Sequence, residues 1–551
     1  MRGLVKKNHF FRMGSVFQSR LSYLYPVIIA LLSIAGAWIV SYSTSLGPWG
    51  GSDSYEYLVS TRSMLRGIGI GYYSVTGVFH WISLHPPFYP IVLGTISLFG
   101  IDLVNAARWL DIILFALTIG TTGIILFHFC NSTFYSILAC LLVLAFSPML
   151  KIYTSVMSEP LFFFLCVLHV LFLLIYLRTP QIKWLLVSAL TAGLAALTRY
   201  IGISLIGAAV VSLLMFSKGT GSGRIKKSVM FLAVASLPLL LWSGWLYFGP
   251  EHSLAGRSAS LELSGLLRRL QPFRLAVVDT IWGWLPFQDK ISEARYRVRL
   301  AFLSLIVIGT SVITIIAYKR FLRDKFAKAV SNNLHVFGTF GLFSLAYLAF
   351  LAFSTAFSNL PPDINDRMLL PVYISVVVAL FAAFSLWGKV WLTGFRQVFK
   401  IIPWFLVAAC VLQYQSQSLS YISKQHNIKG MHYWEHTEIV AAVQALPLNI
   451  PIISTRPNIL LLWADRPAYL IKMNFSSEFL SQTGPFGTDP HDPLQVLFQQ
   501  QGAALVDFND LSPQFLQKYG GEYVERLDLL IKGLVVYQQF PDGVIYFYPG
   551  R

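Results

Sequence analysis

The chain alternates between long apolar runs and short stretches rich in lysine and arginine. A run of roughly 16–25 apolar residues can cross the hydrocarbon core of a bilayer as a helix. The pattern therefore predicts an all-α polytopic membrane bundle with about eleven spans. These spans are Tyr25–Ser43, Ala106–Phe129, Thr133–Leu150, Pro160–Leu177, Trp184–Thr198, Ile201–Phe216, Ser228–Phe248, Leu300–Tyr318, His335–Ser354, Met368–Trp387 and Ile401–Leu419.

The apolar run Phe88–Ile101 is short and follows Pro86-Pro87, so we interpret it as an interfacial or re-entrant helix. With this run excluded from the spans, the internal basic segments all fall on the cytoplasmic side, as the positive-inside rule requires. If the run Phe88–Ile101 were counted as a span, these internal basic segments would all lie on the outer side. These segments are Arg178–Lys183, Lys218–Lys227, Lys319–Lys328 and Lys389–Lys400.

The basic N-terminus, Met1–Arg20, contains no acidic residue and precedes the first apolar run. Because that run is long and no small-residue cleavage site stands clear of it, we expect an uncleaved span with a cytoplasmic N-terminus. The same topology places residues 46–105, the segments 151–159, 250–299 and 355–367, and the C-terminal tail on the outer side. We expect a multi-pass protein of the plasma (inner) membrane.

The tail, residues 421–551, is more polar than the rest of the chain, and its apolar and polar residues alternate as in a soluble domain. Glu438–Leu446 predicts an amphipathic helix, and Ile450–Ser454 and Ala503–Phe508 predict short buried strands. Val535–Phe547 predicts a hairpin around Pro541-Asp542-Gly543. We therefore divide the chain into a membrane module, residues 1–420 with an outer loop at 46–105, and a small extracytoplasmic α/β domain at 421–551.

Composition supports the membrane interpretation. Of 551 residues, 55% are hydrophobic and only 12% are charged, about half the charged share of a soluble domain. This excludes soluble, disordered and fibrous classes. The net charge of +17 fits basic loops facing an anionic leaflet, and we expect no nucleic-acid partner. The four cysteines lie in apolar runs without a CxxC pair, so they indicate no disulfide framework.

Candidate chemistry gathers in the predicted outer segments. Asp53 follows Gly50-Gly51 just after the first span, Tyr57 comes one turn later, and Leu58–Gly67 predicts a short helix. Arg108 and Arg199 lie at span ends, where a charge in apolar surroundings is costly and usually functional. The sequence has no P-loop, G-x-G-x-x-G or H-E-x-x-H motif, so it offers no support for nucleotide-driven or zincin chemistry.

An ordered set of short markers resembles the type C membrane glycosyltransferases, nearest to the protein O-mannosyltransferase and lipid A aminoarabinose transferase group. Each marker is weak alone, and their order along the chain is what carries the resemblance. The markers are Asp53-x-x-x-Tyr57-x-x-x-x-Arg62, His85-Pro86-Pro87-Phe88-Tyr89, Ala106-Ala107-Arg108, Ser158-Glu159-Pro160, Leu197-Thr198-Arg199-Tyr200 and Asp366-Arg367-Met368-Leu369-Leu370-Pro371.

The resemblance implies a transferase that takes a sugar from a polyprenyl-phosphate donor and delivers it to an envelope acceptor on the outer face. It implies that Asp53 is the catalytic acid, which acts as general base or steadies the acceptor. The remaining markers are implied to bind substrate or lipid phosphate, since Arg and His donate to phosphate oxygens. These residues are Tyr57, Arg62, His85, Arg108, Glu159, Arg199 and Arg367.

Two departures from the family pattern bear on the substrate. Some relatives carry an Asp-Glu pair where this chain has Asp53-Ser54, and Glu56 offers a carboxylate at another register. His85 stands where the aminoarabinose type has lysine, which makes that contact titratable near neutral pH. We expect no cofactor and no metal site; a divalent cation stays open, without support from the sequence.

Structural alternatives stay open for these residues. Asp53 could cap the following helix. Glu159 could be a structural acid whose negative charge is stabilised by the dipole of the helix that starts near Pro160. The arginines could be structural, with Arg108 and Arg199 paired to Asp111, Asp102 or Glu159, and Arg367 paired to Asp366. His85 and Glu56 could be an interfacial histidine and a solvated loop acid.

Two rival functions remain open. One is a polytopic lipid or glycan transporter or flippase, although the sequence shows neither a polar path nor a half-repeat. The other is a non-catalytic subunit with the same fold. Replacing Asp53 distinguishes the catalytic from the non-catalytic reading.

Overall fold

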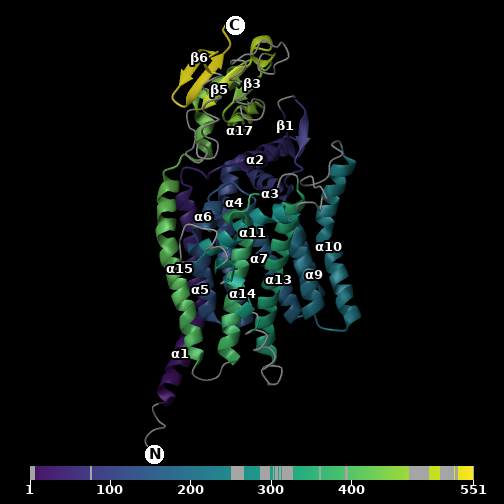
Figure 1. Ribbon diagram of the computed structural model, residues 1–551, viewed down its shortest axis with the longest axis vertical. Helices are drawn as coiled ribbons and strands as arrows, with labels where there is room; N and C mark the ends of the chain where they lie inside the picture. Colours follow the sequence, from purple (N-terminus) through teal and green to yellow (C-terminus); the bar gives the residue numbers. More distant parts are fainter. Residues whose placement is uncertain are drawn as a thin grey trace, which may run out of the picture. The chain divides into compact units, whose positions relative to one another are not determined.

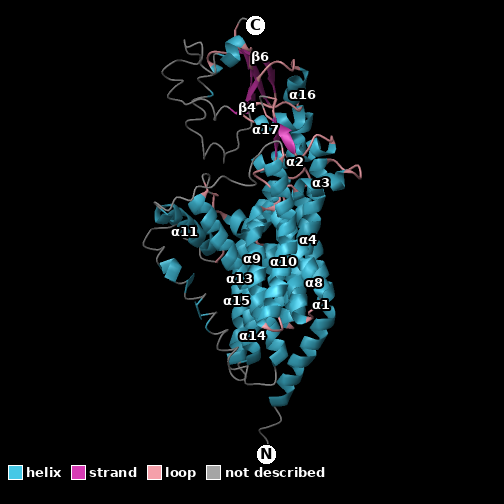
Figure 2. Ribbon diagram, turned by 90° about the vertical axis from the view of Figure 1, so that its right-hand side faces the viewer, coloured by secondary structure: helices cyan, strands magenta, loops and turns pink. Residues whose placement is uncertain are grey.

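The computed structural model describes residues 7–74, 77–249, 266–285, 298–301, 303–304, 308–309, 312, 327–358, 362–390, 395–470, 496–508, 527 and 531–549. The described part is mostly helical (Figures 1 and 2). The chain divides into two compact units. Unit 1 is Met1–Ser45, Ser83–Tyr89 and Ala107–Ile428, and unit 2 is Leu46–Ile82, Pro90–Ala106 and Lys429–Arg551.

Unit 1 is built from long helices that pack side by side (Figure 1). Its closest helix pairs include α13 with α14 and α7 with α8. The helices are α1 (Lys7–Ser43), α4 (Leu103–Cys130), α5 (Thr133–Ala145), α6 (Ser147–Tyr153), α7 (Glu159–Arg178), α8 (Ile182–Thr198), α9 (Ile203–Phe216), α10 (Gly221–Phe248), α11 (Leu266–Gly283), α13 (Ala327–Phe357), α14 (Asp366–Val390) and α15 (Phe395–His426), with a 3₁₀ turn η1 (Tyr200–Gly202).

Within the described ranges, six helices are long and apolar enough to cross a membrane: α1, α4, α7, α10, α13 and α14. The number rises to seven if the bent pair of α5 and α6 forms one span. The predicted span Leu300–Tyr318 lies largely outside the described residues. The prediction of about eleven spans therefore stays a prediction.

The predicted span Thr133–Leu150 is not a single continuous helix. The structure breaks it at Phe146 into α5 and α6, which are bent by 62°. Pro148 lies in the first turn of α6 and has no N–H with which to continue the hydrogen bonds of α5. A hydropathy pattern does not predict this break, because it carries no information about the direction of the backbone.

Unit 2 combines a mixed sheet with short helices, drawn in magenta and cyan in Figure 2. The sheet order is β4-β3-β5-β7-β6, with β4, β3 and β5 parallel and β7 antiparallel to both β5 and β6. The strands are β3 (Ile452–Ser454), β4 (Tyr469–Leu470), β5 (Ala504–Phe508), β6 (Val535–Phe540) and β7 (Gly543–Phe547). Buried Ile453, Phe498 and Leu505 centre its core.

The remaining elements of unit 2 come from the first loop and from the tail. They are α2 (Ser52–Leu65), the hairpin strands β1 (Gly71–Tyr73) and β2 (Phe79–Trp81), α3 (Phe88–Ser97), the 3₁₀ helix η2 (Met431–His436), α16 (Glu438–Ala445), α17 (Pro457–Ile459), and the π-helical turns η3 (Leu460–Ala464) and η4 (Val496–Gln500). The predicted tail helix, its two buried strands and the C-terminal hairpin are confirmed as elements.

Helix α2 begins earlier than the sequence predicted, at Ser52 rather than Leu58. The N–H of Gly51 donates to the Ser54 hydroxyl at 2.9 Å, which closes the first turn. At the other end the N–H of Gly67 donates to the Met64 carbonyl. Gly67 has φ +76°, which favours glycine, and the helix stops there. Asp53 therefore lies on a capped helix rather than in a loop.

Candidate functional site

The carboxylates of Asp53 and Glu56 lie one turn apart on α2 in unit 2. Asp53 is in the first helical turn, where the helix dipole favours a negative charge, and it accepts a hydrogen bond from the Ser52 hydroxyl at 3.3 Å. Both side chains are half-buried. Burial, and then the charge of Asp53, raise the pKa of Glu56 to about 7. The interpretation of Glu56 as a solvated loop acid is therefore wrong.

The raised pKa of Glu56 makes the stability of the protein depend on pH. In the unfolded chain this carboxyl group loses its proton at an ordinary pKa of 4.5, whereas in the folded chain it keeps the proton until about pH 7. The free energy of unfolding should therefore fall by roughly 2 kcal/mol between these limits, after allowance for partial exposure.

Replacing Glu56 by glutamine should remove this decrease in the free energy of unfolding with rising pH. The measurement is the thermal unfolding midpoint of wild type and Glu56→Gln from pH 4.5 to 8. Glu438→Gln removes an exposed carboxylate of the same unit and controls for the loss of a charge. Parallel curves for wild type and Glu56→Gln would contradict the assignment.

Tyr57 and Arg62 follow Asp53 on α2 in unit 2. The Tyr57 side chain is fully buried. The Arg62 guanidinium donates to the carbonyls of Leu461 and Leu462 at the end of η3, and it pairs with Asp465 at 3.1 Å. Arg62 thus satisfies carbonyls that the end of η3 leaves without intrahelical donors. Its predicted contact with lipid phosphate remains a prediction.

A buried charge cluster in unit 1 joins three of the predicted residues. The Glu159 carboxylate, at the start of α7, accepts from the Arg199 guanidinium at 2.7 Å and from Nε of Arg367. Glu159 is 1% exposed. Arg199 also donates to the Ser158 hydroxyl at 3.2 Å. The three charges sum to +1, so the cluster is suited to an anion as a further partner.

Three helices bring this cluster together, and a fourth element joins it. Glu159 opens α7, Arg199 directly follows α8, and Arg367 lies in the first turn of α14. Tyr347 of α13 interacts electrostatically with all three charges, and its hydroxyl donates to the Met368 carbonyl at 2.8 Å. Sequence analysis missed Tyr347, because no motif surrounds it within its apolar run.

Arg108 makes its contacts with α1 and not with the charge cluster. Its Nε donates to the Thr44 hydroxyl at 3.0 Å and its Nη2 to the Ser41 carbonyl at 3.0 Å. The guanidinium also lies over the Trp109 ring, 5.4 Å from its centroid. Arg108 thus holds α4 to the end of α1, a structural role other than the pairing with Asp111, Asp102 or Glu159 that the sequence left open. A role in binding lipid phosphate stays a prediction.

The segment that carries His85 is held in unit 1 by a tyrosine. The Tyr200 hydroxyl donates to the Ser83 carbonyl at 2.8 Å, and Trp242 Nε1 donates to the Tyr200 oxygen at 3.4 Å. His85 itself is half-buried. Because Tyr200 directly follows Arg199, one short turn positions both the cluster and this segment.

No group of three or more His, Cys, Asp or Glu side chains suited to a metal ion occurs among the residues that the structure describes. The charged residues described above are carboxylates and arginines. Carboxylates can take up a proton, and arginines can hold phosphate oxygens.

Comparisons with known proteins extend this picture. The model of the dolichyl-phosphate-mannose-protein mannosyltransferase family matches residues 85–248, a segment that contains His85, Arg108, Glu159 and Arg199 but not Asp53. The crystal structure of ArnT from Cupriavidus metallidurans bound to undecaprenyl phosphate is 14% identical, with a TM-score of 0.50, and the match covers 94% of this chain and 97% of that one.

A second solved structure is similar over nearly the whole chain. It is the cryo-EM structure of the arabinofuranosyltransferase AftD from Mycobacteria, with 13% identity, a TM-score of 0.54, and coverage of 95% of this chain and 41% of that one. This chain has the type C glycosyltransferase fold. No curated protein matches its sequence significantly.

The type C fold confirms the resemblance drawn from the ordered sequence markers. It also confirms an integral, multi-pass membrane protein. The family match and the type C fold are those of membrane glycosyltransferases that use lipid-linked sugars.

Proposed function

We propose that this protein transfers a sugar from a polyprenyl-phosphate donor to a lipid, glycan or protein acceptor on the extracytoplasmic face of the membrane. The observation that carries the proposal is the Glu159–Arg199–Arg367 cluster. It places two guanidinium groups and one carboxylate, with a net charge of +1, at helix ends within a bundle of the type C fold. A lipid phosphate supplies the anion that such a cluster can hold at the edge of the apolar bundle.

In this mechanism the Asp53 carboxylate takes the proton of the acceptor hydroxyl. The acceptor oxygen attacks the anomeric carbon of the sugar, and the bond from that carbon to the phosphate oxygen breaks. Prenyl phosphate leaves with the bonding electron pair. Arg199 and Arg367 stabilise the leaving phosphate, which needs cations rather than an acid.

The remaining assignments belong to the same proposal. Tyr57, Arg62, His85 and Arg108 contribute to substrate binding or to holding the elements that bind substrate. About eleven helices cross the plasma membrane, with the N-terminus in the cytoplasm and residues 421–551 forming an outer α/β domain. The basic internal loops support this orientation.

The test uses purified full-length protein in lipid nanodiscs. It is given a panel of radiolabelled polyprenyl-phosphate sugars, with membrane extract as the source of acceptor. We expect label to leave the lipid for one class of donor and to appear in an acceptor fraction. Binding of prenyl phosphate without transfer from any donor would contradict a transferase and favour a flippase or a non-catalytic subunit.

A further inference from the structure

The groups of the proposed reaction are carried by different units of the chain. Arg199 and Arg367, which are proposed to hold the donor phosphate, lie in unit 1, whereas Asp53 lies on α2 in unit 2. A general base works only within hydrogen-bond reach of the proton that it takes. Each unit must therefore hold its own groups firmly in place.

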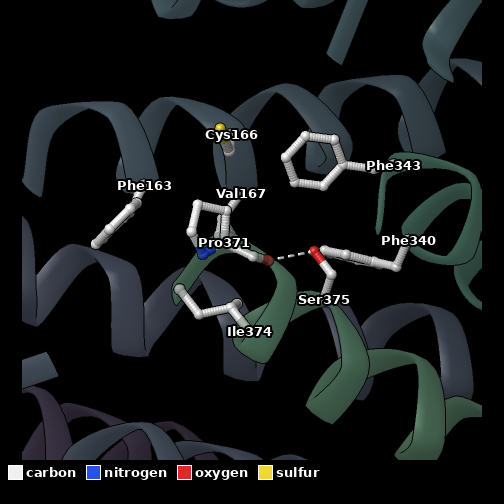
Figure 3. Close-up of a pocket in the computed structure, with 8 residues that line it drawn as sticks. All are labelled: Phe163, Cys166, Val167, Phe340, Phe343, Pro371, Ile374 and Ser375. Carbon is white, nitrogen blue, oxygen red and sulfur yellow. Dashed lines mark hydrogen bonds between the residues drawn. The ribbon is translucent and has the colours of Figure 1, made fainter. Parts of the chain in front are cut away.

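Unit 1 holds part of its charge cluster on a packed apolar core. Phe163 of α7 and Pro371 of α14 follow Glu159 and Arg367 by one turn. Together with Phe343 of α13 they line a small apolar pocket inside the bundle (Figure 3). A close-packed interior resists displacement of its side chains. The packing of these helices therefore fixes the charged residues from within unit 1.

Helix α2 carries the acid in unit 2, and its residues divide between two faces. Tyr55, Arg62 and Arg66 follow one another at i, i+7 and i+11, a spacing that places them on one face. Asp53 and Glu56, at i and i+3, lie on the other side of the helix. A contact on the arginine face can therefore hold α2 without covering the two acids.

The arginine face contacts the tail near the end of α2. Arg62 donates to the carbonyl of Leu461 at 2.8 Å and to that of Leu462. The carboxylate of Asp465 accepts from both arginines, with one oxygen for each: Arg62 at 3.1 Å and Arg66 at 2.7 Å. A single tail carboxylate thus joins two successive turns of α2.

Asp465 is itself fixed within the tail. It ends η3 in the left-handed conformation, with φ +55°, and the next residue, Arg466, is 6% exposed. The Arg466 guanidinium donates to three carbonyls of the connection between α16 and β3, those of Leu446, Pro447 and Ile450. Because these bonds hold the corner at Asp465, its carboxylate is a fixed point for the arginines of α2.

The chain that leads into α2 is tied to the tail as well. The N–H of Gly430 donates to the Leu46 carbonyl at 3.1 Å, and the N–H of Met431 donates to the Pro48 carbonyl at 3.0 Å. A Cβ atom at Gly430 would lie 2.4 Å from the Leu46 oxygen, so this close approach of two backbones requires glycine. The tail therefore holds α2 at both ends.

We propose that the tail positions the catalytic acid: Asp465, through the arginines of α2, orients this helix so that the Asp53 carboxylate reaches the acceptor hydroxyl. The inference rests on the function proposed above. It makes Asp465 and Arg66 positioning residues, and it assigns Arg62 to the orientation of α2. Exposed ion pairs contribute little to stability, whereas a displacement of 1 Å at the reacting atoms can cost about 10²-fold in rate. The contact should therefore affect the rate more than the unfolding midpoint.

The experiment uses the full chain in nanodiscs and measures single-turnover sugar transfer, the thermal unfolding midpoint and the affinity for undecaprenyl phosphate. Asp465→Asn removes the charge and keeps the backbone, since asparagine tolerates a left-handed conformation. It should slow transfer about three- to tenfold, the equivalent of two exposed ion pairs, and keep the wild-type midpoint. Arg62→Gln also removes the donors to η3 and should slow transfer about tenfold to hundredfold.

A double-mutant cycle tests whether the two charges act as one contact. Arg66→Gln alone should slow transfer about two- to threefold, and it should add nothing in the Asp465→Asn background, where its partner is already lost. Glu438→Gln is the matched control, because it removes an exposed carboxylate elsewhere in unit 2. It should keep the wild-type rate. All these variants should bind undecaprenyl phosphate as tightly as wild type.

The outcomes separate this inference from the proposed function. Wild-type rates in both Asp465→Asn and Arg62→Gln would overturn the inference while sugar transfer stands. Weaker binding of undecaprenyl phosphate by Arg62→Gln would also overturn it, since Arg62 would then contact the phosphate. So would a lower unfolding midpoint of Asp465→Asn that accounts for its loss of rate. A wild type that transfers no sugar contradicts the proposed function itself.

Discussion

Replacing Asp53 by asparagine should lower the turnover number for sugar transfer about 10²- to 10⁴-fold, the usual contribution of a general base. The amide has the shape of the carboxylate but cannot take up the acceptor proton. Folding should change little, because the helix dipole contributes only about 0.3–1 kcal/mol to a carboxylate in the first turn. The measurement is single-turnover transfer from the donor identified in the labelling experiment.

Ser52→Ala is the matched control for Asp53→Asn. It removes the hydroxyl that donates to Asp53 and leaves the carboxylate and α2 in place. We expect a change in rate of less than about tenfold, the equivalent of one hydrogen bond. If Asp53→Asn kept the wild-type rate, Asp53 would be only a helix-terminal residue, and the non-catalytic alternative would gain support.

Much of this architecture could be predicted because each signal was local. The apolar runs, the N-terminal acid of α2 and the C-terminal hairpin depend on residues close together in sequence. The ordered motifs also identified Glu159, Arg199 and Arg367 separately. The sequence left the pairing of Arg199 with Glu159 open as an alternative, and it did not predict the pairing of Arg367 with Glu159. The second pairing depends on the packing of helices about two hundred residues apart in sequence.

Arg62 shows why the remainder could not be predicted. Its spacing from Asp53 resembles a family motif, yet its guanidinium donates to two tail carbonyls some four hundred residues away. A backbone carbonyl has no sequence signature, so no pattern predicts such a partner. The burial of Tyr57 is likewise set by packing rather than by spacing.

Replacing Glu159 by glutamine should cost roughly 3–5 kcal/mol of stability, because Arg199 and Arg367 then lose their shared carboxylate in a largely buried site. The thermal unfolding midpoint in nanodiscs measures this loss. Ser158→Ala removes only the hydroxyl that accepts from Arg199 and should cost about 1 kcal/mol.

A lipid phosphate should partly rescue Glu159→Gln, since its anion replaces the lost negative charge between the two arginines. Addition of undecaprenyl phosphate should therefore raise the unfolding midpoint of Glu159→Gln more than that of wild type or Ser158→Ala. Undecaprenol, which has no phosphate, should have no such effect. If all the proteins gained equally from the phosphate, the arginine pair would be a structural brace, and the donor phosphate would have to be held elsewhere. A selective rescue would assign the phosphate to Arg199 and Arg367, because only a ligand that contacts those arginines can stand in for the carboxylate of Glu159.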